Sequence, residues 1–167
     1  MIKKNALIRK LPAVETLGST NIILSDKTGT LTKNEMTVKK VYVNALEIQV
    51  TGSGYDIKGS FLFNNNNYYA KELELLLKIG MVCNNSSIDT EKNDISGDPT
   101  EVSLLVSAAK FGLKKNEIDL DNKRIDEVPF DAEKKYMATI NQYLNKKLIY
   151  VKGAPDTIIN MCSHTLI

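Results

Sequence analysis

The alternation of apolar and polar positions divides the chain into short strands and longer helices. Runs rich in β-branched and aromatic residues predict strands, whereas apolar residues spaced three and four apart predict helices. The predicted strands cover residues 21–24, 38–43, 46–50, 124–130, 136–143 and 147–152. The predicted helices cover residues 69–83 and 99–111, with a short closing helix that begins at Pro155. The polar stretches 64–67 and 84–97 predict exposed loops, the second of them mobile.

The second predicted helix carries its own start and stop signals. Asp98 is placed to cap it, Pro99 takes the first helical position and Glu101 the third. Gly112 is the residue type that most often ends a helix. The strands that follow are joined by short turns, so we expect a mostly antiparallel sheet with helices packed on it.

The composition narrows the classes of partner. The 167 residues include 22 basic and 20 acidic side chains, for a net charge of +2, and no basic cluster is interleaved with aromatic residues. Nucleic acid is therefore not an expected partner. No apolar run approaches the roughly 18 residues that a membrane span needs, so we expect the chain by itself to be soluble. Cys83 and Cys162 lie far apart in the sequence, which favours buried free thiols over a metal site.

An apolar run at residues 21–24 leads to Asp26 and then to the turn Lys27-Thr28-Gly29-Thr30. This pattern predicts a buried strand that delivers a carboxylate to its C-terminal tip, where open α/β sheets place their chemistry. A carboxylate can attack phosphorus when cations and backbone N–H groups offset the charge of the phosphate. Aspartate phosphatases of the haloacid-dehalogenase class use a second Asp two positions later as general acid and base, a role that Thr28 cannot take. The expected aspartyl phosphate is therefore long-lived, which suits a pump better than a phosphatase.

Residues 25–32, Ser-Asp-Lys-Thr-Gly-Thr-Leu-Thr, resemble the phosphorylation motif of P-type ATPases, and the lead-in at residues 4–18 resembles their calcium-pump branch. The resemblance implies that Asp26 is the phosphorylated nucleophile and that Lys27 and Thr28 assist it. It also implies that Asp26 and Thr28 contribute to a Mg²⁺ site whose remaining ligands are absent from this chain. ATP and Mg²⁺ are the implied cofactors.

Two further patterns resemble the nucleotide-binding domain of calcium-type members of the family. Residues 97–101 resemble a motif whose glutamate, here Glu101, reaches toward the adenine amino group. Residues 129–137 resemble a segment whose phenylalanine, here Phe130, stacks on adenine, with Lys135 lying near the base. Each pattern also has an explanation without a ligand, because Glu101 suits a helix start by itself and Phe130 suits an apolar core.

A third pattern, residues 151–156, resembles the Lys-Gly-Ala-Pro-Glu motif of the same domain, with Asp156 in place of the glutamate. The resemblance places Lys152 beside the nucleotide. Gly153 then leaves room for close approach, since glycine has no side chain. A solvated lysine on a hairpin is the alternative. The three patterns occur in the family's order, which makes their joint match more specific than any one of them.

Over the whole chain the resemblance implies an α+β fold in two parts. Residues 1–35 would be the N-terminal piece, with the first strand, of a haloacid-dehalogenase-like α/β phosphorylation domain. Residues 36–167 would be a nucleotide-binding domain, a mostly antiparallel sheet with packed helices, incomplete at its C-terminal end. The implied function is the ATP-binding cytoplasmic part of a P-type ATPase that couples ATP hydrolysis, through the aspartyl phosphate, to transport of a cation, Ca²⁺ in the branch it resembles. The partners are then ATP and the rest of the pump, at the cytoplasmic face of a membrane.

Two alternatives stay open: a phosphatase of the haloacid-dehalogenase type, and a nucleotide-binding module without catalysis. No Thr-Gly-Asp motif or Asp-rich metal loop follows Lys152, so we expect the chain alone not to phosphorylate itself. An apolar strand at residues 21–24 without parallel neighbours would seek another edge. We therefore expect residues 1–30 either to be poorly ordered or to self-associate with a second copy.

Overall fold

The computed structural model describes residues 15, 16, 18–89 and 94–165. The chain divides into two compact units, residues 1–34 and residues 35–167, and each is described by itself. Most of the lead-in at residues 4–18 lies outside the described residues. The elements from β1 to α5 all belong to the larger unit.

The larger unit combines four helices with three antiparallel sheets in its described residues. The strands are β1 (Lys40–Val43), β2 (Leu46–Val50), β3 (Phe61–Phe63), β4 (Asn66–Asn67), β5 (Ser87–Asp89), β6 (Asp94–Ser96), β7 (Lys123–Asp131), β8 (Tyr136–Tyr143) and β9 (Lys146–Gly153). The helices are α2 (Lys71–Val82), α3 (Pro99–Lys110), α4 (Lys115–Asp121) and α5 (Pro155–Met161). The predicted α+β class is confirmed, with the strands arranged as sheets β1-β2-β3-β4, β5-β6 and β7-β8-β9.

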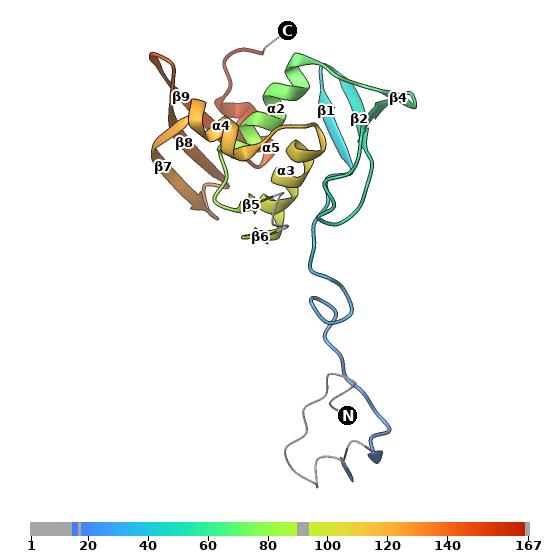
Figure 1. The fold of residues 1–167 in the computed structure, drawn as a ribbon. Coiled ribbons are helices and arrows are strands. Elements are labelled where there is room, and N and C mark those ends of the chain that lie inside the picture. The colour runs from blue at the N-terminus through green and yellow to red at the C-terminus, as the bar shows by residue number, and fades with distance from the viewer. Residues whose placement is uncertain (1–14, 17, 90–93, 166–167) are drawn as a thin grey trace. The chain divides into compact units, whose positions relative to one another are not determined.

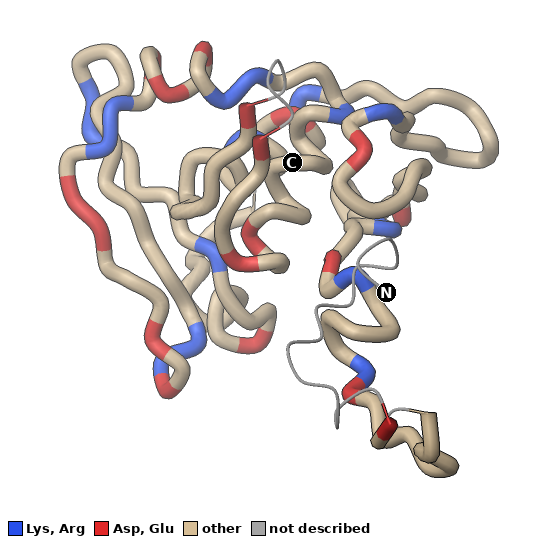
Figure 2. Tube along the Cα trace, turned by 60° about the horizontal axis from the view of Figure 1, so that its bottom comes forward, with Lys and Arg blue, Asp and Glu red and all other residues tan. Residues whose placement is uncertain are grey.

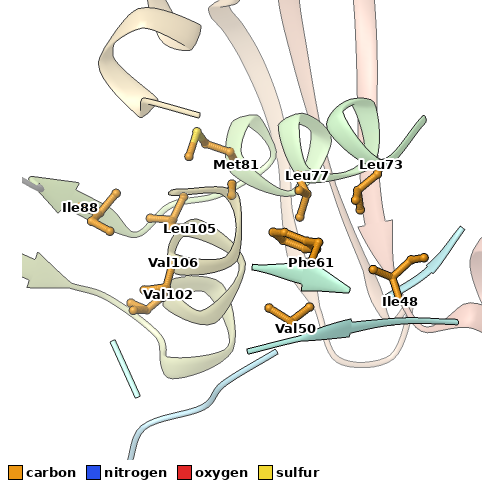
Figure 3. Packing of buried hydrophobic residues seen from close by; sticks show 11 residues of the cluster. Ile48, Val50, Phe61, Leu73, Leu77, Met81, Ile88, Val102, Leu105 and Val106 are labelled. Atoms are coloured by element: carbon orange, nitrogen blue, oxygen red, sulfur yellow. The ribbon is translucent and has the colours of Figure 1, made fainter. Parts of the chain in front are cut away.

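The main core lies between the four-stranded sheet and helices α2 and α3 (Figure 1). Leu73, Leu77 and Met81 recur every four residues, so one face of α2 is apolar along its whole length. Figure 3 shows Leu73 and Leu77 above Phe61 of β3. Leu105 of α3, which is fully buried, completes this layer. Burying each of these side chains stabilises the unit by about 1.5–3 kcal/mol.

The C-terminal end of α2 packs on the other large sheet, β7-β8-β9. Val82 and Cys83 form a small buried cluster with Met137 of β8 and Tyr150 of β9. Helix α2 therefore lies between the two larger sheets and contacts both (Figure 1). This position fixes the end of α2 beside Met137 of β8, a residue that also lines the cavity described below.

Both predicted polar loops were partly wrong. The stretch 84–97 contains the hairpin β5-β6, in which Ile88 pairs with Ile95, and Ile88 is 9% exposed. The stretch 64–67 contains the two-residue strand β4, paired with β3. The hairpin gains apolar contacts through Ile88 and Ile95, whereas β4 gains only its hydrogen bonds to β3, and these override the weak local strand propensity. The prediction also missed α4, whose first turn carries an ion pair between Lys115 and Asp119.

The unit of residues 1–34 does not contain the predicted buried strand in its described part. Residues 21–24 have no regular secondary structure, and the side chains of Ile22, Ile23 and Leu24 are 73%, 83% and 94% exposed. A strand forms only when a neighbour takes up its backbone hydrogen bonds, and no described residue does so here. The prediction of a buried strand at residues 21–24 was therefore wrong.

The described residues include no membrane-length helix, and the two cysteines differ in exposure. Across the described part of the chain, no helix has the length and apolar character that a membrane span requires. Cys83 is buried, as expected, whereas Cys162 is exposed, so the expectation of two buried thiols was wrong for Cys162. Cys162 directly follows the last residue of α5, a short helix with no buried residues.

Candidate functional site

A cavity of about 920 Å³ opens where the start of α3 meets the ends of β7 and β9. Its volume falls in the range of small-molecule sites, about 300–1,000 Å³. The lining includes five residues that the sequence singled out, drawn from three separate motifs: Glu101, Phe130, Lys135, Lys152 and Gly153. The fold thus brings together, around one cavity, every residue that the sequence assigned to a nucleotide.

The start of α3 holds Glu101 at the cavity wall. The side chain of Asp98 accepts hydrogen bonds from the backbone N–H groups of Thr100 (2.8 Å) and Glu101 (3.3 Å), which confirms the predicted N-cap. Partial burial acts to raise the pKa of Asp98, but these hydrogen bonds and the nearby Lys152 charge outweigh it, so the pKa lies below its usual 3.8. The cap therefore carries a negative charge at neutral pH, next to the positive end of the helix dipole.

Glu101 and Lys152 form an ion pair across the cavity wall, with Lys152 Nζ 2.6 Å from Glu101 Oε1. Their side chains are only 18% and 21% exposed, so water screens the pair less than it would on an open surface. The alternative of a solvated hairpin lysine is therefore wrong. Lys152 also lies opposite Met137, its partner in the register of β8 and β9, and Met137 gives the cavity an apolar floor.

The second carboxylate oxygen of Glu101 is also engaged. Oε2 accepts a hydrogen bond from the backbone N–H of Asn85 at 3.1 Å and one from the hydroxyl of Ser86 at 3.3 Å. Both donors belong to the stretch that the sequence predicted to be a mobile loop. The polar sequence of this stretch did not indicate that Asn85 and Ser86 bind Glu101. The local signal was a run of Asn and Ser directly after the predicted helix 69–83.

Phe130 projects into solvent at the edge of the cavity. Its side chain is 65% exposed, so the alternative that it belongs to the core is wrong. The register of β7 and β8 shifts between Val128 and Asp131, where β7 carries one extra residue. Such a bulge twists a strand and redirects its side chains, which explains how an aromatic residue in a strand faces outward here. An exposed ring beside a cavity can stack on a planar ligand.

Lys135 ends a turn that contacts the end of β9. The carboxylate of Asp131 accepts hydrogen bonds from the backbone N–H groups of Glu133 and Lys134, which lowers the pKa of Asp131 and closes the turn. Lys135 takes a positive φ of 59° at its end. Its carbonyl oxygen accepts a hydrogen bond from the N–H of Ala154 at 2.9 Å.

This packing explains why position 153 must be glycine, which the sequence alone did not show. A Cβ on Gly153 would lie within 2.8 Å of the Lys135 carbonyl oxygen and of the Tyr136 backbone and side chain. Glycine is therefore required for the approach of the two backbones, whether or not a ligand also comes close. The same approach sets the position of Lys135 relative to Lys152.

The side chains at the cavity combine charges of both signs with apolar surface. Two ammonium groups, on Lys135 and Lys152, share the cavity lining with two carboxylates, on Asp98 and Glu101, and Phe130 and Met137 offer apolar surface. Figure 2 shows Lys and Arg interspersed with Asp and Glu along the described part of the chain. These residues fit a nucleotide: a ring for the base, a carboxylate for its amino group and cations for its phosphates.

The residues that resemble a phosphorylation motif, 25–32, lie in the other unit. Asp26 is exposed and precedes a turn in which the N–H groups of Leu31 and Thr32 donate to the Lys27 carbonyl oxygen at 3.0 and 3.1 Å. Gly29 takes a φ of 77° in that turn. Among the described residues no three His, Cys, Asp or Glu side chains gather as a metal site would require. By the resemblance, Asp26 and Thr28 would supply two of the oxygen ligands of a Mg²⁺ ion.

In comparisons with known proteins, the chain is similar to cation-transporting ATPases. The family profile described as "P-type ATPase, cytoplasmic domain N" matches residues 72–167. The chain is 43% identical to a calcium-transporting ATPase of Bacillus subtilis over 98% of its length, and 41% identical to the cation-transporting ATPase pma1 of Synechocystis over its full length. It is 39% identical, over 98% of its length, to the human calcium-transporting ATPase type 2C member 1. It spans only 18–19% of the length of these relatives.

Proposed function

Since the chain belongs to the P-type ATPase family and matches its cytoplasmic domain N, we propose that residues 35–167 bind ATP in the cavity between α3, β7 and β9. The observation that carries this proposal is the convergence of Glu101, Phe130, Lys135, Lys152 and Gly153 on that cavity.

In the proposed complex the adenine stacks on Phe130, and the carboxylate of Glu101 accepts a hydrogen bond from the adenine amino group. Lys152, paired with Glu101, and Lys135 lie beside the bound nucleotide, and Met137 excludes water beneath the base. Stacking contributes about 1–3 kcal/mol. A dissociation constant near 1 mM corresponds to about 4 kcal/mol, so stacking and two polar contacts give binding in the micromolar to millimolar range.

We further propose that the whole protein transfers the γ-phosphoryl group to Asp26. A carboxylate oxygen attacks phosphorus, the bond to the bridging oxygen of ADP breaks, and ADP leaves with the electron pair. Mg²⁺ would offset the charge on the phosphates. Water then cleaves the acyl phosphate and restores the carboxylate. Thr28 offers no carboxylate to speed that second step, which leaves a long-lived intermediate. By the names of its relatives, the transported ion is Ca²⁺.

Isothermal titration of this chain with ATP tests the binding proposal. We expect saturable binding that Phe130→Ala and Lys152→Ala each weaken, with dispersed amide resonances showing that both variants stay folded. Ile149→Ala is a matched control, because Ile149 is 64% exposed in the same three-stranded sheet and does not line the cavity. Absence of saturable binding to the folded wild-type chain would overturn the proposal.

A protein of the relatives' length that contains this chain tests the transfer step. Radiolabelled ATP should place acid-stable phosphate on the wild-type protein in a Ca²⁺-dependent manner, and Asp26→Asn should abolish the label. Label that persists in the Asn variant would place the phosphorylated residue elsewhere. Label that depends on a different cation would retain the mechanism and reject Ca²⁺ as the transported ion.

A further inference from the structure

Arg124, near the start of β7, holds the segment behind Glu101 without lining the cavity itself. One guanidinium nitrogen donates to the carbonyl oxygens of Val82 (2.9 Å) and Asn84 (2.6 Å). The other donates to Asn85 Oδ1 at 2.5 Å and to the carboxylate of Glu127 at 2.8 Å. A single side chain thus closes the end of α2 and fixes the segment of residues 84–86 that follows it. A planar fork with several donors can do this, whereas a lysine ammonium cannot match the geometry.

The segment of residues 84–86 in turn fixes Glu101. The Asn85 N–H and the Ser86 hydroxyl donate to Glu101 Oε2, and the Asn84 side chain donates to the Glu101 backbone carbonyl at 2.9 Å. Asn84 is 2% exposed and also accepts the Ser86 N–H at 2.9 Å, so the segment is internally braced. A continuous set of hydrogen bonds therefore runs from Arg124 through Asn85 to the carboxylate.

This arrangement leaves Glu101 able to accept one more donor. Oε1 receives Lys152, and Oε2 receives Asn85 and Ser86. A carboxylate offers about four acceptor sites, so one remains for a ligand N–H. Because Lys152, Asn85 and Ser86 occupy the other acceptor sites of the Glu101 carboxylate, the remaining site has a fixed position. A carboxylate held in this way does not lose rotamer freedom when a ligand binds, which is where preorganised sites gain affinity.

We propose that Arg124 and Asn85 are positioning residues that make the site selective for a purine base with an exocyclic amino group. Arg124 does not line the cavity. Asn85 does, but its assigned role lies in its hydrogen bonds to Glu101 and Arg124. They act through Glu101, whose remaining acceptor site they aim at the amino group of the base. The inference rests on the proposed function, since it takes the cavity to be a nucleotide site and Glu101 to face the base.

The test compares ATP with purine riboside triphosphate, which differs only by lacking the amino group. For the wild-type chain we expect ATP to bind about tenfold more tightly than the analogue, the value of one hydrogen bond to a charged group. For Arg124→Met the ratio should fall to about one, with the affinity for the analogue unchanged. Arg124→Lys should give an intermediate ratio, because one donor cannot replace the fork.

Asn85 supplies a second variant in case Arg124→Met does not fold. Asn85 is exposed, and Asn85→Leu removes the acceptor for Arg124 but keeps the backbone N–H. This variant should lose selectivity, whereas Asn85→Asp, which still accepts from Arg124, should retain it. Lys123→Met is the matched control: it removes a cation one residue from Arg124, on an exposed side chain, and should leave the ratio unchanged.

The outcomes separate the two proposals. If the wild-type chain does not bind ATP, the proposed function fails. If it binds ATP and the analogue equally, or if Arg124→Met and Asn85→Leu weaken both ligands by the same factor, the proposed function stands and the positioning role is overturned. The selectivity ratio decides the matter because a purely structural role for Arg124 would lower stability without distinguishing the two ligands.

Discussion

The ammonium of Lys152 lies 2.6 Å from the carboxylate of Glu101, although 51 positions separate the two residues in the chain. The pair joins the end of β9 to the first turn of α3, and it sets the charge at one wall of the cavity. Because Glu101 is also held by Asn85 and Ser86, the lysine is the partner with more freedom to turn toward a ligand. A nucleotide in the cavity would therefore contact Lys152 while Glu101 keeps its other partners.

Removing this cation should affect binding and stability together. We expect Lys152→Met to weaken ATP binding at least tenfold and to lower the free energy of unfolding by about 1–3 kcal/mol, since Glu101 loses its charged partner in a poorly solvated place. Titration calorimetry and urea unfolding measure the two effects. Lys147→Met, an exposed substitution on the same strand, should change neither. An unchanged ATP affinity in Lys152→Met would remove Lys152 from the proposed site.

The Phe130 ring should matter for binding and not for folding. With 65% of the side chain exposed, Phe130→Leu should change the free energy of unfolding by less than about 0.5 kcal/mol. The same substitution should weaken ATP binding about 5- to 100-fold through lost stacking. Fluorescence competition with a labelled nucleotide and thermal unfolding report the two quantities. A large loss of stability with intact binding would instead make Phe130 a structural residue.

The cap at the start of α3 should give the unit a specific response to acid. The pKa of Asp98 lies below its usual 3.8 in the folded chain, so the charged cap stabilises fully at neutral pH and its contribution is lost as pH falls through that lowered pKa. Asp98→Ala should cost about 1 kcal/mol at pH 7. Urea unfolding of wild type and Asp98→Asn should show a stability difference at pH 7 that shrinks below about pH 4. A difference that grows in acid would contradict this assignment.

The two cysteines should react very differently. Burial raises the pKa of the Cys83 thiol, although the nearby Lys152 charge opposes the rise, whereas Cys162 is exposed. In the folded chain we therefore expect rapid reaction of Cys162 alone with an aromatic disulfide reagent near pH 8. Both thiols should react in denaturant. Cys162→Ser should abolish the rapid phase, and fast labelling that survives this substitution would show that the α2 end opens readily.

Local sequence determined the elements whose signals lie within a few residues. Asp98, Pro99 and Glu101 satisfy the start of α3 by themselves, and the spacing of Leu73, Leu77 and Met81 is enough to predict α2. The motif residues of the site could be named for a similar reason, because their types and order resemble a known family. None of these predictions needed knowledge of what lies across the fold.

The tertiary structure decided everything that depends on distant partners. From the sequence, residues 84–86 are predicted to be a polar loop. In the structure they bind Glu101 and Arg124. These hydrogen bonds join residues 16 and 40 positions apart, so they produce no periodic pattern in the sequence. Only the structure shows that residues 21–24 are exposed. Only the structure shows that the Lys135 carbonyl leaves no room for a Cβ at Gly153. Propensity and capping act along the chain and can be read from it, whereas burial and charge pairing arise only when separate segments meet.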